Sequence, residues 1–425
     1  MATTVGVQPP TTFDAPAPVA DGVTSTVAPL PPKRERLISL DVFRGLTIAG
    51  MLLVNNPGTW SAIYPPLEHA TWHGWTPTDL IFPFFLFIVG ITTHLSLSAR
   101  RERGDSEAQL VRQILRRGAI IFLLGFLMSL FPFYQWGTIE GMVNPSVWDR
   151  IAYRWDHVRI LGVLQRIGLV YIAAGLLTLK TTLKQQVIIL AVLLYGYWFA
   201  MTLIPIPGKT IGALLLDKPS ETLAAHLDRA ILGMKHIWSG SVTYDPEGPF
   251  STIPAIGTAI LGVLAGRWIA QRKRPLFERL CGLYGAGSLA MVLGLMWSWS
   301  FPINKNIWTS SYVLFTAGMA CVALATIMWI IEVHDIRWWT KPFVIYGVNP
   351  IVAFVGSGVL ARCIYTLWKV QYNGQATPVE TVIYKEAFAS WLEPKNASLA
   401  MAFVTVLFWF AILAFLYRRK IFLKV

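Results

Sequence analysis

Ten apolar stretches of about twenty residues set the fold class of this chain. Each is long enough to cross a hydrocarbon core of about 30 Å as a helix. Only 14% of the 425 residues are charged, against about 25% in a typical soluble domain. The sequence therefore predicts an all-α integral membrane protein with ten transmembrane helices in one bundle. The expected helices are 38–56, 77–98, 112–131, 159–178, 184–204, 252–270, 280–300, 309–332, 341–364 and 397–417.

Basic residues mark the two sides of the predicted bundle. The segment before the first helix and every second loop after it carry 22 Lys and Arg residues, whereas the other loops carry 11 and the short segment 57–76 carries none. Cytoplasmic loops of membrane proteins are enriched in Lys and Arg. We therefore expect both termini in the cytoplasm and segment 57–76 outside. Because the charge of +13 is spread over many loops, it does not indicate a nucleic-acid partner, and membrane lipid is the expected contact.

The chain divides into a tail and one membrane domain. Residues 1–36 are rich in Pro, Thr, Ala and Val, end in a basic cluster and lack the pattern of a cleaved signal peptide, so they predict a disordered cytoplasmic tail. Residues 37–425 form the transmembrane domain. The long outer segments 132–158, 205–251 and 365–396 are expected to cap its outer mouth.

Charged residues inside the predicted helices are candidates for function, since a charge at the bilayer centre costs about 2.5–3.5 kcal/mol on insertion scales. Asp41 and Arg44 are three residues apart on the first helix. They fit either a local ion pair or an anion site that contacts a phosphate from the cytoplasm. Arg166 lies about two turns inside the fourth helix, which favours a buried role. Asn349 is a polar residue in the ninth helix, where helix–helix hydrogen bonding is one explanation.

Two histidines precede the second expected helix, and an aspartate lies at its start, in "HATWHGWTPTDLIFPFFLFIVG", residues 69–90. Asp79 is placed to orient an imidazole or to hold a cationic substrate. The spacing of His69 and His73 does not indicate a metal site, because no Cys or HExxH motif accompanies them. Asn55, at the end of the first helix, fits either a capping role or a hydrogen-bond donor that points into the outer mouth.

Six separated blocks of the sequence resemble a known family. They are "LDVFRGLTIAGMLLVNN", "HATWHGWTPTDLIFPFFLFIVG", "RILGVLQRIGLVY", "YDPEGPFSTIPAIGTAILGVLAG", "PINKNIWTSSYV" and "YGVNPIVAFVG", in that order. Together they are similar to the membrane region of heparan-α-glucosaminide N-acetyltransferase and to its shorter bacterial relatives of the NagX type. The resemblance runs from about residue 36 to the end of the sequence.

This resemblance implies an acyltransferase of the bacterial inner membrane. Acetyl-CoA in the cytoplasm would supply the acetyl group, and an amino sugar of the glucosamine type would receive it on the periplasmic side. The catalytic histidine of the family falls on His69 and its catalytic asparagine on Asn55. His73 stands where the lysosomal enzymes have Asn, so its role stays open. Lysosomal relatives also suggest a homodimer.

The mechanistic hypothesis assigns a role to each candidate residue. His69 acts as the base, Asn55 as the oxyanion donor, and Asp79 orients the site or the substrate. Direct transfer and an acetyl-histidine intermediate both remain open. Acetyl-CoA is expected to contact Asp41, Arg44, Arg166 and Asn349. The acceptor is expected to contact Asp245, Glu247, Asn304 and Lys305.

Three other functions compete with this hypothesis. A transporter for glucosamine or N-acetylglucosamine would use the same number of helices, although we find no convincing inverted repeat. An acyltransferase acting on a cell-envelope polysaccharide would share the chemistry and differ only in its acceptor. A non-catalytic scaffold is disfavoured by the charges within the helices, since these are costly to insert.

Overall fold

The computed structural model describes residues 37–423, so the predicted disordered tail at 1–36 lies outside the described residues. The described chain is mainly helical, with one short antiparallel hairpin in which Lys369 pairs with Pro378 and Tyr372 with Gln375. The helices are α1 (Ile38–Asn55), α2 (Ile81–Glu102), α3 (Glu107–Leu130), α4 (Val147–Asp156), α5 (Val163–Lys180), α6 (Leu183–Leu203), α7 (Leu223–Leu232), α8 (Pro249–Ile269), α9 (Leu276–Trp297), α10 (Ser310–Met328), α11 (Thr340–Val348), α12 (Pro350–Arg362), α13 (Val379–Ile383) and α14 (Pro394–Arg418); the strands are β1 (Lys369–Tyr372) and β2 (Gln375–Pro378).

The prediction of an all-α protein with ten membrane-crossing helices is confirmed. Within residues 37–423, ten helices are long and apolar enough to span a bilayer. They are α1, α2, α3, α5, α6, α8, α9, α10, α12 and α14, where α2, α10 and α12 include the turns continuous with them. The third begins earlier than expected, at Glu107, because Ser106 and Gln109 form a reciprocal cap at its N-terminus.

The ninth predicted helix, 341–364, is not continuous. It is broken into α11 and α12 at Asn349, whose backbone leaves the helical region with φ −126° and ψ 52°. Pro350 begins α12, and a proline has no N–H to continue the hydrogen-bond ladder of the preceding helix. Asn349 is therefore the point where the chain turns, and the membrane-crossing part begins after it, at Pro350.

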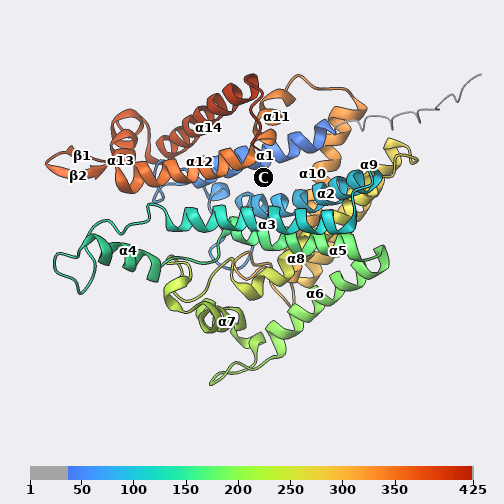
Figure 1. Ribbon diagram of the computed structural model, residues 1–425, viewed down its shortest axis with the longest axis horizontal. Coiled ribbons are helices and arrows are strands. Elements are labelled where there is room, and N and C mark those ends of the chain that lie inside the picture. Colours follow the sequence, from blue (N-terminus) through green and yellow to red (C-terminus); the bar gives the residue numbers. More distant parts are fainter. Residues whose placement is uncertain (1–36, 424–425) are drawn as a thin grey trace, which may run out of the picture. The chain divides into compact units, whose positions relative to one another are not determined.

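Two groups of helices meet along α2. In Figure 1, α1, α11, α12 and α14 lie on one side of the bundle, and α3, α5, α6 and α8 lie on the other. The buried core between α2, α5, α8 and α10 includes Leu86, Val170, Ala255, Ile260 and Val313.

Helices α2 and α8 pack closely because glycines remove the side chain at their contact. A Cβ on Gly90 would lie 2.0 Å from the carbonyl oxygen of Ala259, and one on Gly262 would lie 2.1 Å from that of Phe87. Because the atoms at these short distances belong to the backbone of the other helix, any larger residue at either glycine would push the two helices apart. This contact fixes the segments that precede α2 and α8, which carry the candidate functional residues.

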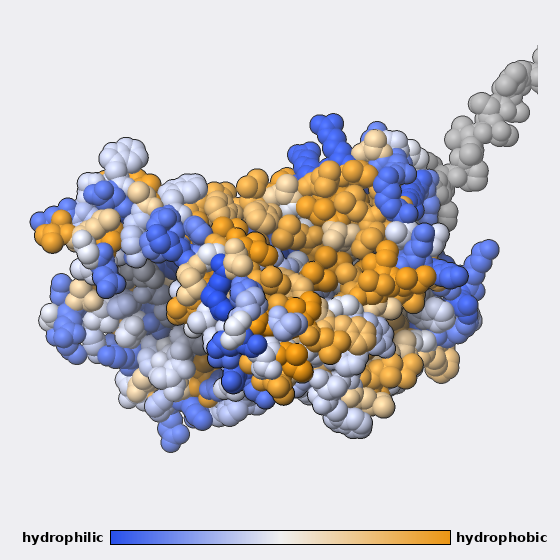
Figure 2. All heavy atoms as spheres, turned by 90° about the horizontal axis from the view of Figure 1, so that it is seen from below, coloured by the Kyte–Doolittle hydropathy of each residue, from blue (hydrophilic) through white to orange (hydrophobic). Residues whose placement is uncertain are grey.

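The surface agrees with a protein that crosses a membrane. On the face shown in Figure 2, a broad apolar area is flanked by hydrophilic residues toward the ends of the molecule. The segments without membrane-crossing helices gather together, because α4, the hairpin and α13 lie at the same end of the bundle in Figure 1. That end corresponds to the outer caps expected at 132–158 and 365–396.

Candidate functional site

A cavity of about 540 Å³ opens between the two groups of helices. Its walls come from α1, α2, α5 and α12, from the segment before α8 and from the loop between α9 and α10. Apolar side chains form most of the wall. The polar and charged residues that line it are Thr47, Asn55, His69, Thr71, Thr78, Asp79, Arg159, Tyr244, Glu247, Lys305 and Asn306.

His69 and Asp79 meet in this cavity, an arrangement that fits the first of the two roles left open for Asp79. Asp79 lies in a short 3-10 turn, Pro77–Leu80, where it caps the backbone of Thr76. Its Oδ1 accepts a hydrogen bond from Nδ1 of His69 at 2.7 Å, and its Oδ2 accepts one from the backbone N–H of Ala70 at 3.0 Å. The Asp79 side chain is 1% exposed and that of His69 is 47% exposed. A buried carboxylate therefore orients an imidazole that stays accessible.

Lys305 completes this group, which we call the imidazole cluster (His69, Asp79 and Lys305). Its Nζ lies 2.9 Å from Nδ1 and 3.1 Å from Nε2 of His69, and 3.4 Å from Oδ1 of Asp79. Burial lowers the pKa of Lys305, although the charges of Asp79 and Glu247 act in the opposite direction. An ammonium and a carboxylate thus flank the same imidazole.

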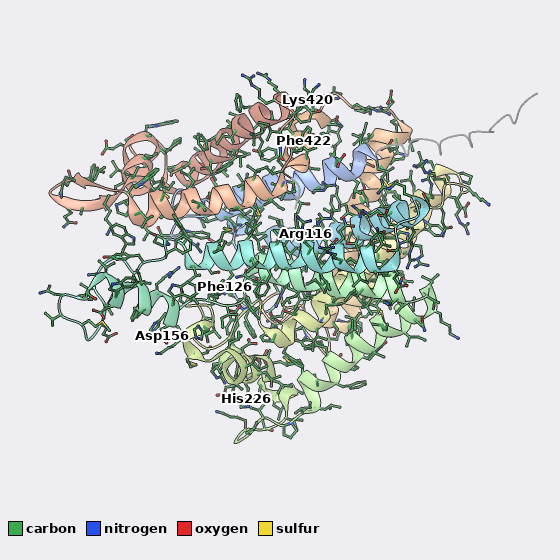
Figure 3. The ribbon with its side chains drawn as sticks, viewed as in Figure 1. Arg116, Phe126, Asp156, His226, Lys420 and Phe422 are labelled. Carbon is green, nitrogen blue, oxygen red and sulfur yellow. The ribbon has the colours of Figure 1, made fainter. Side chains whose placement is uncertain are left out.

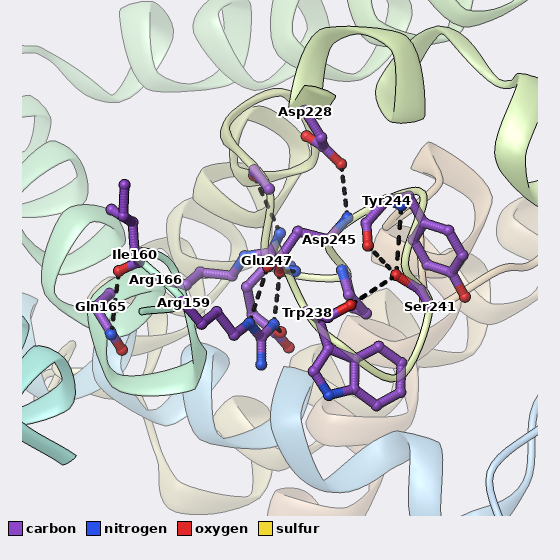
Figure 4. A network of polar contacts seen from close by, with 12 residues as sticks. Arg159, Ile160, Gln165, Arg166, Asp228, Trp238, Ser241, Tyr244, Asp245 and Glu247 are labelled. Atoms are coloured by element: carbon purple, nitrogen blue, oxygen red, sulfur yellow. Dashed lines mark hydrogen bonds and ion pairs between the residues drawn. The ribbon is translucent and has the colours of Figure 1, made fainter. Parts of the chain in front are cut away.

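A second group, the arginine network (Arg159, Asp245 and Glu247), forms another wall (Figure 4). Arg159 donates from Nε to Asp245 at 2.9 Å and from Nη2 to both Asp245 and Glu247. Burial alone would raise the pKa of Glu247, but the charges of Arg159 and Arg166 hold it below its ordinary value. The network joins the residues just before α5 to those just before α8.

Behind the arginine network lies a further carboxylate, on α7. Asp228 accepts a hydrogen bond from the backbone N–H of Asp245 at 3.0 Å. Burial raises the pKa of Asp228 to about 7, against that hydrogen bond, which lowers it. Since its other oxygen is buried without a hydrogen-bond partner among the described residues, Asp228 is a structural carboxylate whose ionised form is poorly solvated.

Comparison with known proteins places these residues in a family. The family model for the catalytic region of heparan-α-glucosaminide N-acetyltransferase matches residues 36–294. The chain belongs to this family. It is 30% identical to the human heparan-α-glucosaminide N-acetyltransferase over 95% of its own length, and 30% identical to the mouse protein over 92%. It spans 61% and 60% of the lengths of those two relatives.

Asn55 faces the cavity, whereas its neighbour has the capping role. Asn56 donates from Nδ2 to the carbonyl of Leu52 at 2.8 Å and so satisfies the end of α1. Asn55, the last residue of the helix, lines the cavity together with His69. The sequence left two roles open for Asn55, a helix cap or a hydrogen-bond donor to the cavity. This placement favours the hydrogen-bond donor.

The residues expected to contact acetyl-CoA do not line the cavity. Arg44 donates to Asp41 at 3.1 Å and to the carbonyl of Gly347 at 2.8 Å, which fixes α1 to α11. Arg166 is fully buried, donates to Ser251 and lies over the ring of Trp308, with 5.1 Å from its Cζ to the ring centroid.

Asn349 holds the C-terminal segment instead of facing the cavity. Its Nδ2 donates to the carbonyl of Ile421 at 3.0 Å, and its Oδ1 accepts from the backbone N–H of Leu423 at 3.0 Å. In Figure 3, Lys420 and Phe422 of this segment lie beside α11. The asparagine that breaks the ninth helix therefore also ties down the chain after α14.

The four residues predicted to contact the acceptor sugar divide into two pairs. Glu247 and Lys305 line the cavity, whereas Asp245 and Asn304 are buried behind it. Asn304 supports the loop of Lys305, because its Oδ1 accepts from the backbone N–H of Ile307 at 3.1 Å. Its Nδ2 also lies 3.4 Å from Nδ1 of His73.

Sequence reasoning missed several residues of the cavity wall. Arg159 was counted only as a loop charge, although it opens the block "RILGVLQRIGLVY". Trp238 and Tyr244 come from the outer segment 205–251, where no periodic pattern marks them. Among residues 37–423, no group of three or more His, Cys, Asp or Glu side chains is arranged to hold a metal ion.

Proposed function

We propose that this protein is a membrane acyltransferase that moves the acetyl group of acetyl-CoA to the amine of a glucosamine-type sugar. The single observation that carries the proposal is the pairing of His69 with Asp79 at 2.7 Å inside a cavity that also holds Asn55. Membership of the family supports it, because the named relatives are glucosaminide N-acetyltransferases. The identity of the acceptor and of the donor is part of the proposal.

In this mechanism His69 is the general base. Because Nδ1 donates to Asp79, a neutral imidazole carries its lone pair on Nε2, the nitrogen that can take a proton from the attacking amine. A positioned base of this kind contributes roughly 10²–10⁴-fold to the rate. Asp79 holds the tautomer and stabilises the imidazolium that forms.

Asn55 is the proposed donor to the oxyanion. An amide N–H directed at the carbonyl oxygen of a tetrahedral intermediate contributes about 10²–10³-fold. Asn55 and His69 line one cavity from different elements, the end of α1 and the loop before α2. Direct transfer to the sugar and an acetyl-histidine intermediate both use this arrangement.

Acetyl-CoA is proposed to enter from the cytoplasmic side. Thr47, one turn along α1 from Arg44, lines the cavity, and Asn55 lines it at the other end of the helix. Arg44 stays the proposed contact for a CoA phosphate near the start of α1, with Asp41 orienting its guanidinium. Arg166 and Asn349 lie outside the cavity wall. We propose that they support the residues that line the path of acetyl-CoA.

The acceptor is proposed to enter from the periplasm. On the positive-inside rule we propose that both termini lie in the cytoplasm and the segment of His69 lies outside, in a bacterial inner membrane. Glu247 in the wall and Asp245 behind it are the proposed carboxylates for an amino sugar, and Asn304 supports the loop of Lys305, the fourth proposed acceptor contact. A homodimer is proposed because the resemblance to the lysosomal relatives suggests one.

A sugar transporter is the second candidate, and one observation favours it. The ninth predicted helix is broken at Asn349 and Pro350, and discontinuous helices form the binding sites of many transporters. The proposed acyl transfer needs a general base such as an imidazole oriented by a buried carboxylate, whereas a sugar transporter that is not coupled to protons needs none. The third candidate, transfer to a cell-envelope polysaccharide, keeps the same chemistry with a larger acceptor.

The proposal is tested with the full-length protein in sealed proteoliposomes of known orientation. Acetyl-CoA labelled in the acetyl group is supplied on the face of the termini, and glucosamine on the other face. We expect labelled N-acetylglucosamine to accumulate on the glucosamine side. Movement of unmodified glucosamine without consumption of acetyl-CoA would instead establish the transporter, and labelling of an added amino-polysaccharide but not of glucosamine would establish the third candidate.

A further inference from the structure

Lys305 places an ammonium group directly beside the reacting imidazole. Its Nζ is 3.1 Å from Nε2 of His69, the nitrogen that the proposed mechanism uses. It is also 2.9 Å from Nδ1 of His69 and 3.4 Å from Oδ1 of Asp79. A hydrogen-bond donor is therefore held within hydrogen-bonding distance of the imidazole that the proposed mechanism uses.

The loop that carries Lys305 is fixed on both sides. The carbonyl of Ile303 accepts a hydrogen bond from the backbone N–H of Gly74 at 2.8 Å, which joins this loop to that of His69. The backbone N–H of Asn304 donates to Oγ1 of Thr309 at 3.0 Å. Because the Lys305 side chain is only 20% exposed, its ammonium is held in place before any substrate binds, which is the condition for electrostatic catalysis.

The charges around Lys305 fit a catalytic role better than an acceptor contact. Burial lowers the pKa of Lys305 and the charges of Asp79 and Glu247 oppose that effect, while Arg159 faces the same cavity. A lysine ammonium would repel the ammonium form of an amino sugar, because like charges at close range disfavour each other. It would attract the negative oxygen of a tetrahedral intermediate.

We propose that Lys305 is a further catalytic residue, which donates a hydrogen bond from Nζ to the carbonyl oxygen of the acetyl thioester as that oxygen becomes negative. The inference rests on the proposed function, because the thioester is supplied by acetyl-CoA. Lys305 and Asn55 then form the two donors to one oxyanion. Both side chains line the same cavity.

The balanced step for direct transfer is as follows. The amine nitrogen of the sugar forms a bond to the acetyl carbon, and the π electrons of the carbonyl move to its oxygen, where Lys305 stabilises the charge. Nε2 of His69 takes one proton from the amine. The electron pair then returns, the C–S bond breaks, and the CoA thiolate takes the proton from His69. Lys305 keeps its own protons throughout.

The test compares Lys305→Met and Lys305→Arg in the full-length protein, with acetyl-CoA and glucosamine as substrates. Loss of one oxyanion donor costs about 10²–10³-fold in kcat. We expect Lys305→Met to lower kcat by roughly 10²-fold while the KM for glucosamine changes by less than about threefold. Lys305→Arg keeps the cation, so its kcat should exceed that of Lys305→Met by at least about tenfold. Lys209→Met, in an exposed ion pair with Glu221 of the outer segment, is the matched control and should behave as the wild type.

Several outcomes would overturn the assignment. A raised KM for glucosamine with unchanged kcat would make Lys305 an acceptor contact, and equal losses in the Arg and Met variants would exclude a role for the positive charge. If Lys305→Met does not give a folded protein by thermal unfolding in detergent, Lys305→Leu, which also lacks a hydrogen-bond donor, replaces it with the same expected loss. A fully active Lys305→Met protein refutes this inference alone, whereas a wild-type protein that transfers no acetyl group refutes the proposed function.

Discussion

The imidazole cluster and the arginine network line one cavity but differ in how their charges are satisfied. In the arginine network, the guanidinium of Arg159 binds both carboxylates, and Asp245 is fully buried. In the imidazole cluster, the carboxylate of Asp79 is buried while the ring of His69 is half exposed. In the arginine network every charged group has a partner within the network, and these ion pairs connect the segment before α5 to the segment before α8. The imidazole cluster keeps the ring of His69 accessible, as its proposed catalytic role requires.

This difference predicts opposite responses to substitution. His69 of the imidazole cluster should matter for turnover and little for folding, because its side chain is 47% exposed. A residue of the arginine network should matter for folding, because its removal leaves buried charges without a partner. The variants below measure each response separately.

The largest expected effect is that of His69→Ala on turnover. Removing the general base should lower kcat by at least about 10²-fold, while the thermal unfolding temperature in detergent stays close to that of the wild type. His73→Ala is the matched control, since His73 lies in the same loop but pairs with Asp217 at 2.9 Å and does not line the cavity. We expect it to lose less than about tenfold. Full activity of the His69→Ala protein would show that the catalytic assignment is wrong.

The next effect is that of Arg159→Met on stability. Breaking a buried ion pair from one side costs about 3–5 kcal/mol, because the remaining carboxylates lose their partner. Denaturant unfolding should show this decrease. Arg274→Met removes an ion pair with Glu278 that is exposed to solvent, so its free energy of unfolding should change by less than about 1 kcal/mol. Equal free energies of unfolding for the two variants would contradict a stabilising role for the buried ion pairs of the arginine network.

The smallest effect concerns the pH dependence of stability through Asp228. Its pKa is raised from 3.8 to about 7 in the folded protein, so the folded state holds the proton more tightly than the unfolded chain. This contribution to stability is complete below about pH 4 and is lost as the pH rises through 7, by at most about 1.4 kcal/mol per pH unit.

Asp228→Asn should remove this pH dependence, because the amide oxygen can still accept from the backbone N–H of Asp245 and carries no charge. Unfolding temperatures measured between about pH 4 and pH 8 would then fall less steeply for the variant than for the wild type. A variant whose profile is as steep as that of the wild type would place the titrating group elsewhere.

The sequence predicts the membrane-crossing helices well because length and hydropathy alone decide them. It also brings His69 and Asp79 together, since both flank the start of one helix. It misses the break at Asn349, because the apolar run from 341 to 364 hides a turn that only Pro350 signals. The break depends on contacts with the C-terminal segment, which lies far away in the chain.

The arginine network could not be predicted because its members come from separate loops. Arg159 and Asp245 are 86 residues apart, and nothing in either segment indicates the other. Lys305 was predicted as an acceptor contact from its block, but its position beside His69 depends on how the loop after α9 folds over the loop before α2. Such placements follow from tertiary packing and not from local pattern.

The central claim is that a thioester supplied from the side of the termini reaches His69 at the other end of the cavity. A structure of the purified protein with bound CoA measures this directly. The account predicts that the CoA sulfur lies within about 4 Å of Nε2 of His69, close to the 3–3.5 Å separation of groups about to react. CoA bound with its sulfur outside the cavity, or an imidazole closed off from the ligand, would contradict it.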